Sequence, residues 1–333
     1  MLCHLIGTPP LFIDKQMEHQ FHDWLKKRAQ ELPASADANR AGQFNVIKGI
    51  GDDAAIIDFA GQPLVITTDA IAEGTHFRLP IPLADGPKRT SAFERIGRKA
   101  LAVSLSDIAA MGASAVAATL NFQSPKRLGI EDLQALYHGA SKLAAEFDVA
   151  VVGGDTNTWN GDLVISSTVF GTRSEQITGW SLDGAKPGDA IYVSGAFGGS
   201  IHGRHYDFEP RLRLASYLAT NHQVNSATDA SDSLTSDLFA IARASGVAME
   251  IDLDAVPISE DVQASKEKSA LEHALGDGED FELIFTVSTE VASQLDQAAD
   301  LPTPITKIGR VQNGLTALYD RKGNAIPVSG YEH

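Results

Sequence analysis

The residues of this chain with the clearest chemical potential are aspartates that stand beside glycines. The run Gly49–Ala55 contains the adjacent pair Asp52 and Asp53, and Asp69 ends a Thr-Thr-Asp stretch a short way downstream. Carboxylates of this kind hold Mg²⁺, and neighbouring glycines let the backbone approach phosphate oxygens. Because paired aspartates in a glycine-rich turn are also common in plain surface loops, the hypothesis of a metal–phosphate site depends on further acidic clusters.

One such cluster is formed by Asp229, Ser231 and Asp232. Apolar residues with helical spacing begin at Leu234, and Gly246 is suited to end that helix. The cluster is therefore expected at a helix N-terminus, where carboxylates can hold Mg²⁺ and phosphate together. Helix capping is the alternative interpretation, although a single Ser or Asp suffices for a cap.

Two further acidic features have both a functional and a structural interpretation. The acidic run Glu279–Glu282 precedes the apolar segment Leu283–Val287, and it either joins the same site or protects an edge strand. Asp107 lies among small apolar residues of a predicted helix. That setting favours a buried carboxylate paired with a cation over a solvated one.

A glycine pair marks a third region of interest. Gly153 and Gly154, followed by Asp155, come after the apolar run Val149–Val152, and a Gly-Gly turn at the end of a strand is a weak signal for phosphate or ribose contact. The chain has no P-loop and no protein-kinase motif set. A nucleotide enzyme with this sequence would therefore use carboxylate-bound metal in place of a P-loop lysine.

Composition narrows the classes of partner. The 333 residues are 43% hydrophobic and 21% charged, as in an ordinary globular protein of two domains. A formal net charge of −16 argues against nucleic acid and anionic membranes as partners, and favours phosphorylated substrates only where divalent cations bridge the charges. The single cysteine, Cys3, excludes an internal disulfide and an all-cysteine zinc site. No segment approaches the roughly 20 apolar residues of a membrane span, and a cytoplasmic location is expected.

Hydrophobic periodicity predicts alternating helices and strands, which favours an α/β or α+β fold. The expected helices cover residues 17–32, Ala92–Met111 and a segment from Ile130 to Phe147 whose apolar side includes Leu136 and Tyr137. The expected strands are Ala54–Phe59, Leu64–Thr67, Val149–Val152, Leu163–Gly171 and Ala190–Ser194. Residues 33–43 are expected to form a mobile loop, and a domain boundary is expected at about residues 175–187.

Taken in order, these motifs carry a resemblance to a known family. They are Gly-Ile-Gly-Asp-Asp-Ala-Ala, Thr-Thr-Asp, Glu-Gly-x-His-Phe, the helix segment Gly97–Ala113, Gly-Gly-Asp-Thr, Gly-Ala-Lys-Pro-Gly-Asp, Asp-x-Ser-Asp and Gly-Glu-Asp-Phe-Glu-Leu. Over roughly residues 18–333, the chain resembles the thiamine-monophosphate kinases, a family of the aminoimidazole ribonucleotide synthetase superfamily.

The resemblance implies a two-domain α/β (α+β) fold of the aminoimidazole ribonucleotide synthetase type. An arm of residues 1–17 would precede an ATP- and Mg²⁺-binding dimerisation domain, 18–178, and a C-terminal α/β domain, 185–333. The N-terminal domains of two subunits would form a barrel across a homodimer. The implied reaction is direct, Mg²⁺-assisted transfer of the γ-phosphoryl group of ATP to thiamine monophosphate.

The resemblance also implies roles for individual residues. The implied metal ligands are Asp53, Thr68, Asp69, Asp107, Asp229 and Asp232, of which Asp69 and Asp232 are the implied catalytic residues. The implied nucleotide contacts are Thr67, Thr68, Gly154, Asp155 and Ser231. His76, Glu279 and Tyr331 would face thiamine monophosphate.

The chain departs from the family pattern at several motif positions. Thr158 and Leu182 stand where the family usually has arginines, Ser233 replaces a usual glycine and Ser104 a usual asparagine. Fewer cations would weaken the grip on ATP phosphates. A superfamily member with another phosphoryl acceptor and a catalytically inactive nucleotide-binding protein are therefore the alternatives. The retained carboxylates argue against the inactive protein, because a scaffold does not need clustered like charges.

Overall fold

The computed structural model describes residues 24, 25, 27, 44–79, 87–263, 266 and 268–330. The expected arm, the expected loop 33–43 and Tyr331 lie outside these residues. Of the helix expected over 17–32, only Trp24, Leu25 and Lys27 are described, and they are helical.

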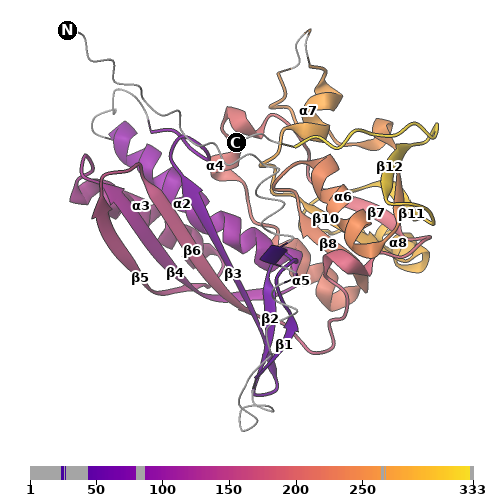
Figure 1. The fold of residues 1–333 in the computed structure, drawn as a ribbon, viewed down its shortest axis with the longest axis horizontal. Helices are drawn as coiled ribbons and strands as arrows, with labels where there is room; N and C mark the ends of the chain where they lie inside the picture. The colour runs from indigo at the N-terminus through magenta and orange to yellow at the C-terminus, as the bar shows by residue number, and fades with distance from the viewer. Residues whose placement is uncertain are drawn as a thin grey trace.

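The first half of the chain builds a six-stranded sheet in the order β1-β2-β3-β6-β4-β5 (Figure 1). Its strands are β1 (Phe44–Lys48), β2 (Ala55–Phe59), β3 (Gln62–Ala72), β4 (Ser114–Pro125), β5 (Ala150–Trp159) and β6 (Val164–Thr172). All neighbouring strands are antiparallel except β4 and β5, which run parallel. Within the described residues the sheet stays open, with β1 and β5 as its edges, and does not close into a barrel.

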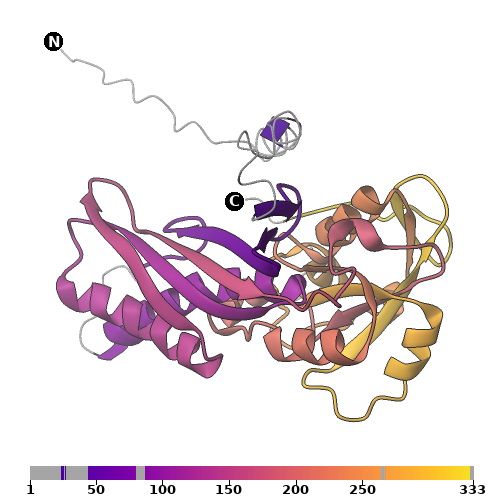
Figure 2. The same ribbon diagram turned by 90° about the horizontal axis from the view of Figure 1, so that it is seen from below.

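One face of this sheet is covered by α2 (Pro87–Ala110) and α3 (Ile130–Glu146), as Figure 2 shows from below. The two helices cross closely at Gly97 and Gly139, where an added Cβ would lie 1.8 Å from a carbonyl oxygen of the opposite helix. Gly112, at φ 60°, follows the end of α2, as the sequence predicted. Ile130 and Tyr137 of the expected apolar side are 68% and 47% exposed, because the buried stripe of α3 is narrower than its apolar pattern.

The predicted strand end at Gly153 is wrong, because β5 continues through the glycine pair to Trp159. Gly154 has a φ of 154°, and a Cβ there would lie 1.7 Å from the carbonyl oxygen of Leu120 on β4. The glycine therefore serves the close approach of two strands and not a turn.

The second half builds another six-stranded sheet in the order β12-β9-β11-β7-β10-β8. Its strands are β7 (Ala190–Ser194), β8 (Val224–Asp229), β9 (Ala248–Ile251), β10 (Leu283–Val287), β11 (Ile305–Gln312) and β12 (Ala317–Asp320). Its helices are α4 (Arg204–Asp207), α5 (Leu212–Asn221), α6 (Leu234–Ser245), α7 (Ala270–Gly276) and α8 (Thr289–Leu295). Because β10 lies inside this sheet, the edge-protection interpretation of Glu279–Glu282 is wrong.

Helix α2 joins the two halves of the molecule. Leu101 of α2 and Val65 of β3 belong to the same buried apolar cluster as Tyr192 and Phe285 of the second sheet. The strands of the first sheet lie within residues 44–172 and those of the second within residues 190–320. The expected domain limits of 178 and 185 therefore fall in the connection between the two sheets.

Candidate active site

Four aspartates that are far apart in sequence meet where the two halves join. Asp53 lies in the turn between β1 and β2, Asp69 on β3, Asp107 on α2 and Asp229 at the end of β8. Burial raises the pKa of Asp107 well above its ordinary value, and the negative charges of Asp69, Asp229 and Asp53 raise it further. The four aspartates, which the resemblance implied as metal ligands, therefore converge in space, although Asp69 lies within a strand and Asp107 within a helix and not at the strand ends and helix starts expected from the sequence.

Local strand geometry aims these side chains. Residues two apart share a face of a strand, so Thr67 and Asp69 both point toward α2. There the Thr67 hydroxyl donates to Asp107 Oδ2 at 2.5 Å, and Ser104 Oγ donates to Asp69 Oδ2 at 2.8 Å. From the second domain, Thr228 Oγ1 donates to Asp53 Oδ1 at 2.9 Å.

The cluster has more negative charge than its partners balance. The carboxylates of Asp53, Asp69 and Asp107 accept hydrogen bonds from neutral hydroxyls, and Oδ2 of Asp53 and Oδ2 of Asp229 are buried without any hydrogen-bond partner among the described residues. Burial, with the charges of Asp69 and Asp232, raises the pKa of Asp229 to about 7. Asp107 is half-buried, and no lysine or arginine of the described residues pairs with it, so the cluster needs a cation from elsewhere.

The turn before α6 brings the Asp229–Asp232 run to the same place. Ser233 Oγ accepts a hydrogen bond from the amide of Ser236 and so caps α6, which leaves the capping interpretation of Asp229 and Asp232 without support. Ser233 has a φ of 172°, an extended conformation open to any residue, so the loss of the usual glycine causes no backbone strain. Ser231 lies exposed in the turn.

Asp237 was missed by the sequence reasoning. Its Oδ2 accepts from the amides of Asp232 and Ser233 at 3.2 and 3.1 Å. Burial, Asp232 and Asp229 raise the pKa of Asp237 well above its ordinary value. Its position three residues after Leu234, on the buried face of the expected helix, was the available signal.

Three of the sequence-predicted residues are not brought to this cluster within one chain. Thr68 points to the opposite face of β3, where its hydroxyl donates to the carbonyl of Ser167 at 3.1 Å. Gly154 and Asp155 are exposed on β5, and β6 and β4 stand between that strand and β3.

A second group of ionisable side chains lies nearby, around Lys99 of α2. The ammonium of Lys99 is fully buried and donates to the carbonyl of His76 at 2.6 Å and to Glu279 Oε1 at 2.7 Å. His205 Nδ1 lies 2.8 Å from the same ammonium. The structure thus brings together His76 and Glu279, both assigned to the acceptor substrate by resemblance, and does so through a lysine that the sequence reasoning did not single out.

The other two carboxylates of the acidic run are held by arginines. Arg204 Nη2 donates to Asp280 Oδ1 at 2.8 Å, and Arg211 donates to both oxygens of Glu282, at 2.6 and 2.5 Å. Both carboxylates are buried. Both carboxylates are therefore paired within the second domain, and removing either arginine would leave a buried charge without its partner.

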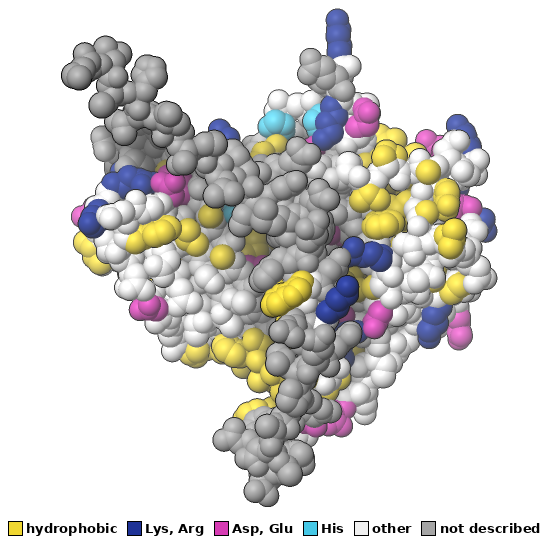
Figure 3. Space-filling view, viewed as in Figure 1, with side chains coloured by type: hydrophobic (Ala, Val, Ile, Leu, Met, Phe, Trp, Pro, Cys, Tyr) yellow, Lys and Arg dark blue, Asp and Glu magenta, His cyan; other side chains and the backbone are white. Residues whose placement is uncertain are grey.

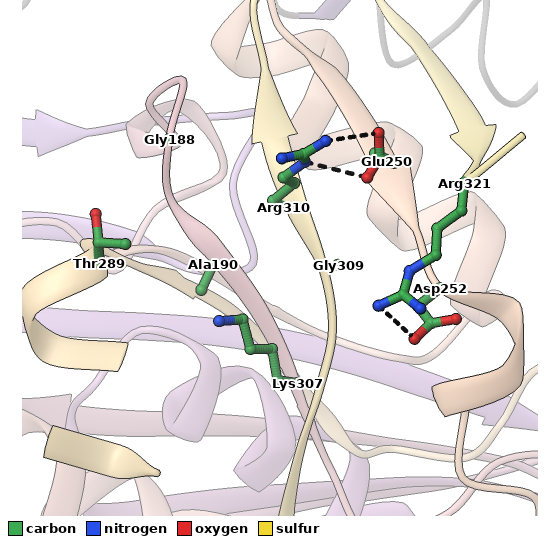
Figure 4. A pocket seen from close by; sticks show the side chains of 9 residues that line it. All are labelled: Gly188, Ala190, Glu250, Asp252, Thr289, Lys307, Gly309, Arg310 and Arg321. Carbon is green, nitrogen blue, oxygen red and sulfur yellow. Dashed lines mark hydrogen bonds and ion pairs between the residues drawn. The ribbon is translucent and has the colours of Figure 1, made fainter. Parts of the chain in front are cut away.

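A hollow of about 690 Å³ lies elsewhere, lined by residues of β7, β9 and β11 in the second sheet (Figure 4). Both arginines that line it form ion pairs, Arg310 with Glu250 and Arg321 with Asp252. It is lined by Gly188, Ala190, Glu250, Asp252, Thr289, Lys307, Gly309, Arg310 and Arg321, and by none of the clustered aspartates. The carboxylate cluster, and not this hollow, is therefore the candidate active site.

Comparison with known proteins gives the same two-part division. The N-terminal domain of AIR synthase related proteins matches residues 51–173, and the C-terminal domain of the same group matches residues 186–319. A curated thiamine-monophosphate kinase of Rhodopirellula baltica is 39% identical over 316 residues, which cover 92% of this chain and 92% of that protein. One from Salmonella typhimurium is 34% identical over 326 residues, 89% of this chain and 95% of that protein.

Solved structures resemble the chain over nearly its whole length. A thiamine-monophosphate kinase from Stenotrophomonas maltophilia K279a has a TM-score of 0.68 at 31% identity, covering 91% of this chain and 96% of that one. A structure described as AaThiL complexed with AMPPCP and TMP has a TM-score of 0.75, covering 98% of this chain and 99% of that one. At 24% identity this second likeness concerns the fold alone. Among the helices of the described residues, none has the length and apolar character that crossing a membrane requires.

Proposed function

This chain belongs to the thiamine-monophosphate kinase family of AIR synthase related proteins, and we propose that its carboxylate cluster is where ATP phosphorylates thiamine monophosphate. The reaction is transfer of the γ-phosphoryl group of ATP, which gives thiamine diphosphate and ADP. The observation that carries the assignment to the cluster is the convergence of Asp53, Asp69, Asp107 and Asp229 with unpaired buried oxygens.

The donor set fits Mg²⁺. This ion prefers carboxylate oxygens and usually takes only one or two from the protein, completing its shell with water and substrate phosphates. Among the described residues, no group of three or more His, Cys, Asp and Glu side chains is already arranged as a metal cage. The orphaned Oδ2 atoms of Asp53 and Asp229 are suited to such partial coordination. Bound there, Mg²⁺ would neutralise charge on the transferred phosphoryl group.

The chain's own residues would do the positioning. Asp53, Asp69, Asp107, Asp229 and Asp232 would hold the metal with its phosphates. Thr67 keeps Asp107 oriented through its 2.5 Å hydrogen bond, and Ser231 in the turn would add an oxygen contact. His76 and Glu279 would line the part of the site that binds the acceptor, thiamine monophosphate. The Glu279 carboxylate is held there by its ion pair with Lys99.

A single-turnover assay tests this function. Radiolabelled ATP, excess enzyme, Mg²⁺ and thiamine monophosphate are expected to give labelled thiamine diphosphate in one exponential phase. Because Thr158 and Leu182 replace family arginines, other phosphorylated acceptors belong in the same assay. Transfer to another acceptor but not to thiamine monophosphate would establish a diverged substrate, and nucleotide binding without any transfer would establish an inactive protein.

The homodimer is part of the same proposal. From Gly153 to Trp159 the edge strand β5 is exposed, and Val152 and Trp159 are 63% and 44% exposed. The sheet face away from α2 and α3 has few charged side chains in the space-filling view (Figure 3). An exposed strand edge that carries Val152 and Trp159 favours pairing with another strand. Pairing there would also let Gly154 and Asp155 face the nucleotide of a second subunit.

We expect the protein to sediment as a dimer at micromolar concentration. Val152→Asp should shift it toward monomer, because it places a charge on the pairing edge. The matched control is Leu315→Asp, which changes an 89% exposed apolar residue of the second domain and should leave the mass unchanged. A wild-type monomer, or equal effects of both variants, would contradict pairing through the first domain.

Cytoplasmic location stays part of the proposal, because ATP is supplied there.

A further inference from the structure

Lys99 connects the two domains, and the proposed phosphoryl transfer gives this buried lysine no role. One of its contacts, the His76 carbonyl, belongs to the loop after β3 in the first domain. The other two, Glu279 and His205, belong to the second domain. A single buried ammonium therefore links a loop of one domain to a segment of the other.

The chemistry of an ammonium group makes this link specific. It has three N–H donors and no acceptor, and here it meets three acceptors at 2.6, 2.7 and 2.8 Å. With Lys99 protonated, His205 Nδ1 accepts this bond, and the ring proton is on Nε2. Glu279 Oε2, 3.1 Å from that nitrogen, is then a buried oxygen without a donor among the described residues. Lys99 is thus the charged partner of the Glu279 carboxylate, with the His205 ring beside it.

Backbone hydrogen bonds extend the link to the carboxylate cluster. The amide of Glu279 donates to the carbonyl of Ser231 at 2.7 Å, and the amide of Phe281 donates to the carbonyl of Ala230 at 2.7 Å. These bonds fix the turn that carries Asp229 and Asp232. Any shift of Glu279 would therefore move the turn with it.

The backbone at Glu279 is also strained. Glu279 and Phe281 have φ angles of 54° and 51°, a left-handed conformation that non-glycine residues adopt rarely and at a cost. Such a conformation persists only where surrounding contacts enforce it. The Lys99 ion pair and the two backbone bonds contribute to enforcing it here, together with the arginine pairs of Asp280 and Glu282.

We propose that Lys99 is a positioning residue for the acceptor side of the site, holding the His76 loop and the Glu279 segment in one fixed relation across the domain junction. This inference rests on the proposed function, because the acceptor side is defined by it. Lys99 does not touch the reacting atoms. It acts through His76, Glu279 and the turn behind Glu279.

The test compares Lys99→Met with the double variant Lys99→Met/Glu279→Gln, using Lys142→Met, at an exposed lysine of α3, as the matched control. For Lys99→Met, kcat/KM for thiamine monophosphate is expected to fall about 100-fold, while KM for ATP stays within about threefold. The double variant removes the unpaired buried charge, so its melting temperature should return toward wild type. Its activity should stay low, because the link is still broken.

Recovery of both melting temperature and activity in the double variant would overturn the proposal, since Lys99 would then only balance a charge. Wild-type kinetics in Lys99→Met would overturn it equally. A readout without turnover separates this inference from the proposed function. In the ligand-free protein, Lys99→Met should speed amide exchange in residues 73–77 and in residues 279–282 together. Faster exchange in one segment alone would refute the link even if the enzyme proved to use another acceptor.

Discussion

Asp69→Asn should lower the rate of phosphoryl transfer by on the order of 100- to 1,000-fold, the usual effect of deleting one electrostatic contact to a transferring group. The amide keeps the shape of the side chain and can still accept the hydrogen bond of Ser104. What it loses is the negative charge that would hold Mg²⁺. The rate of single-turnover transfer to thiamine monophosphate is the measurement.

The same variant should be as stable as wild type without ligand, or more stable. Burial raises the pKa of Asp69, and its charge raises the pKa of Asp107 and of Asp229, so removing it relieves repulsion in the folded state. Asp254→Asn, at an exposed position in the second domain, is the matched control and should change neither property. Unchanged turnover in Asp69→Asn would end the metal-bridged mechanism, and unfolding would make Asp69 a structural residue.

The ligand-free protein should become less stable as the pH rises from about 6 to about 8, with a loss of roughly 5 °C or more in melting temperature. In the folded state the pKa of Asp229 is about 7, against an ordinary value of 3.8. The folded protein therefore holds this proton more tightly than the unfolded chain does. Its contribution to stability is complete below pH 3.8 and is lost as the pH rises through about 7. Asp53, Asp107 and Asp237, whose pKa values burial also raises, act in the same direction.

Mg²⁺ with ATP supplies the internal control for this pH dependence. A ligand that binds only the folded state adds about 2.7 kcal/mol of stability at a 100-fold excess over its Kd. Because Mg²⁺ binds carboxylates in their charged form, it should also flatten or reverse the decline with pH. A melting temperature that rises with pH in the ligand-free protein would show that the cluster is not under electrostatic strain.

Convergence of the aspartates could be predicted from the sequence only in part: Asp53 and Asp229 stand where a strand meets a turn, whereas Asp69 lies within β3 and Asp107 within α2. The sequence also allowed a prediction that Thr68 points away from the aspartates. Successive side chains of a strand alternate between its two faces, so Thr68 cannot share the face of Thr67 and Asp69. Asp237 could have been found from its position on the buried face of α6. The alternation of side chains along a strand predicts the direction of Thr68, and the helical period predicts the buried position of Asp237.

Other features could not be read from local pattern. A glycine pair after an apolar run is typical of a turn, and only the approach of β4 shows that Gly154 belongs inside a strand. The partners of Lys99 lie 106 and 180 residues away along the chain, at His205 and Glu279. No periodicity within α2 indicates which residues will meet its one buried cation.

The path of α2 through both halves has a consequence for folding. One apolar cluster contains Val65 and Leu101 together with Tyr192 and Phe285, so the first half shares its interior with one side of the second sheet, while the second half has a further buried cluster of its own. Loss of the shared cluster should therefore unfold the first sheet and α2 together and expose the side of the second sheet that packs against them. A chain cut between β6 and β7 would yield two fragments that each expose the apolar surface they share in the whole molecule.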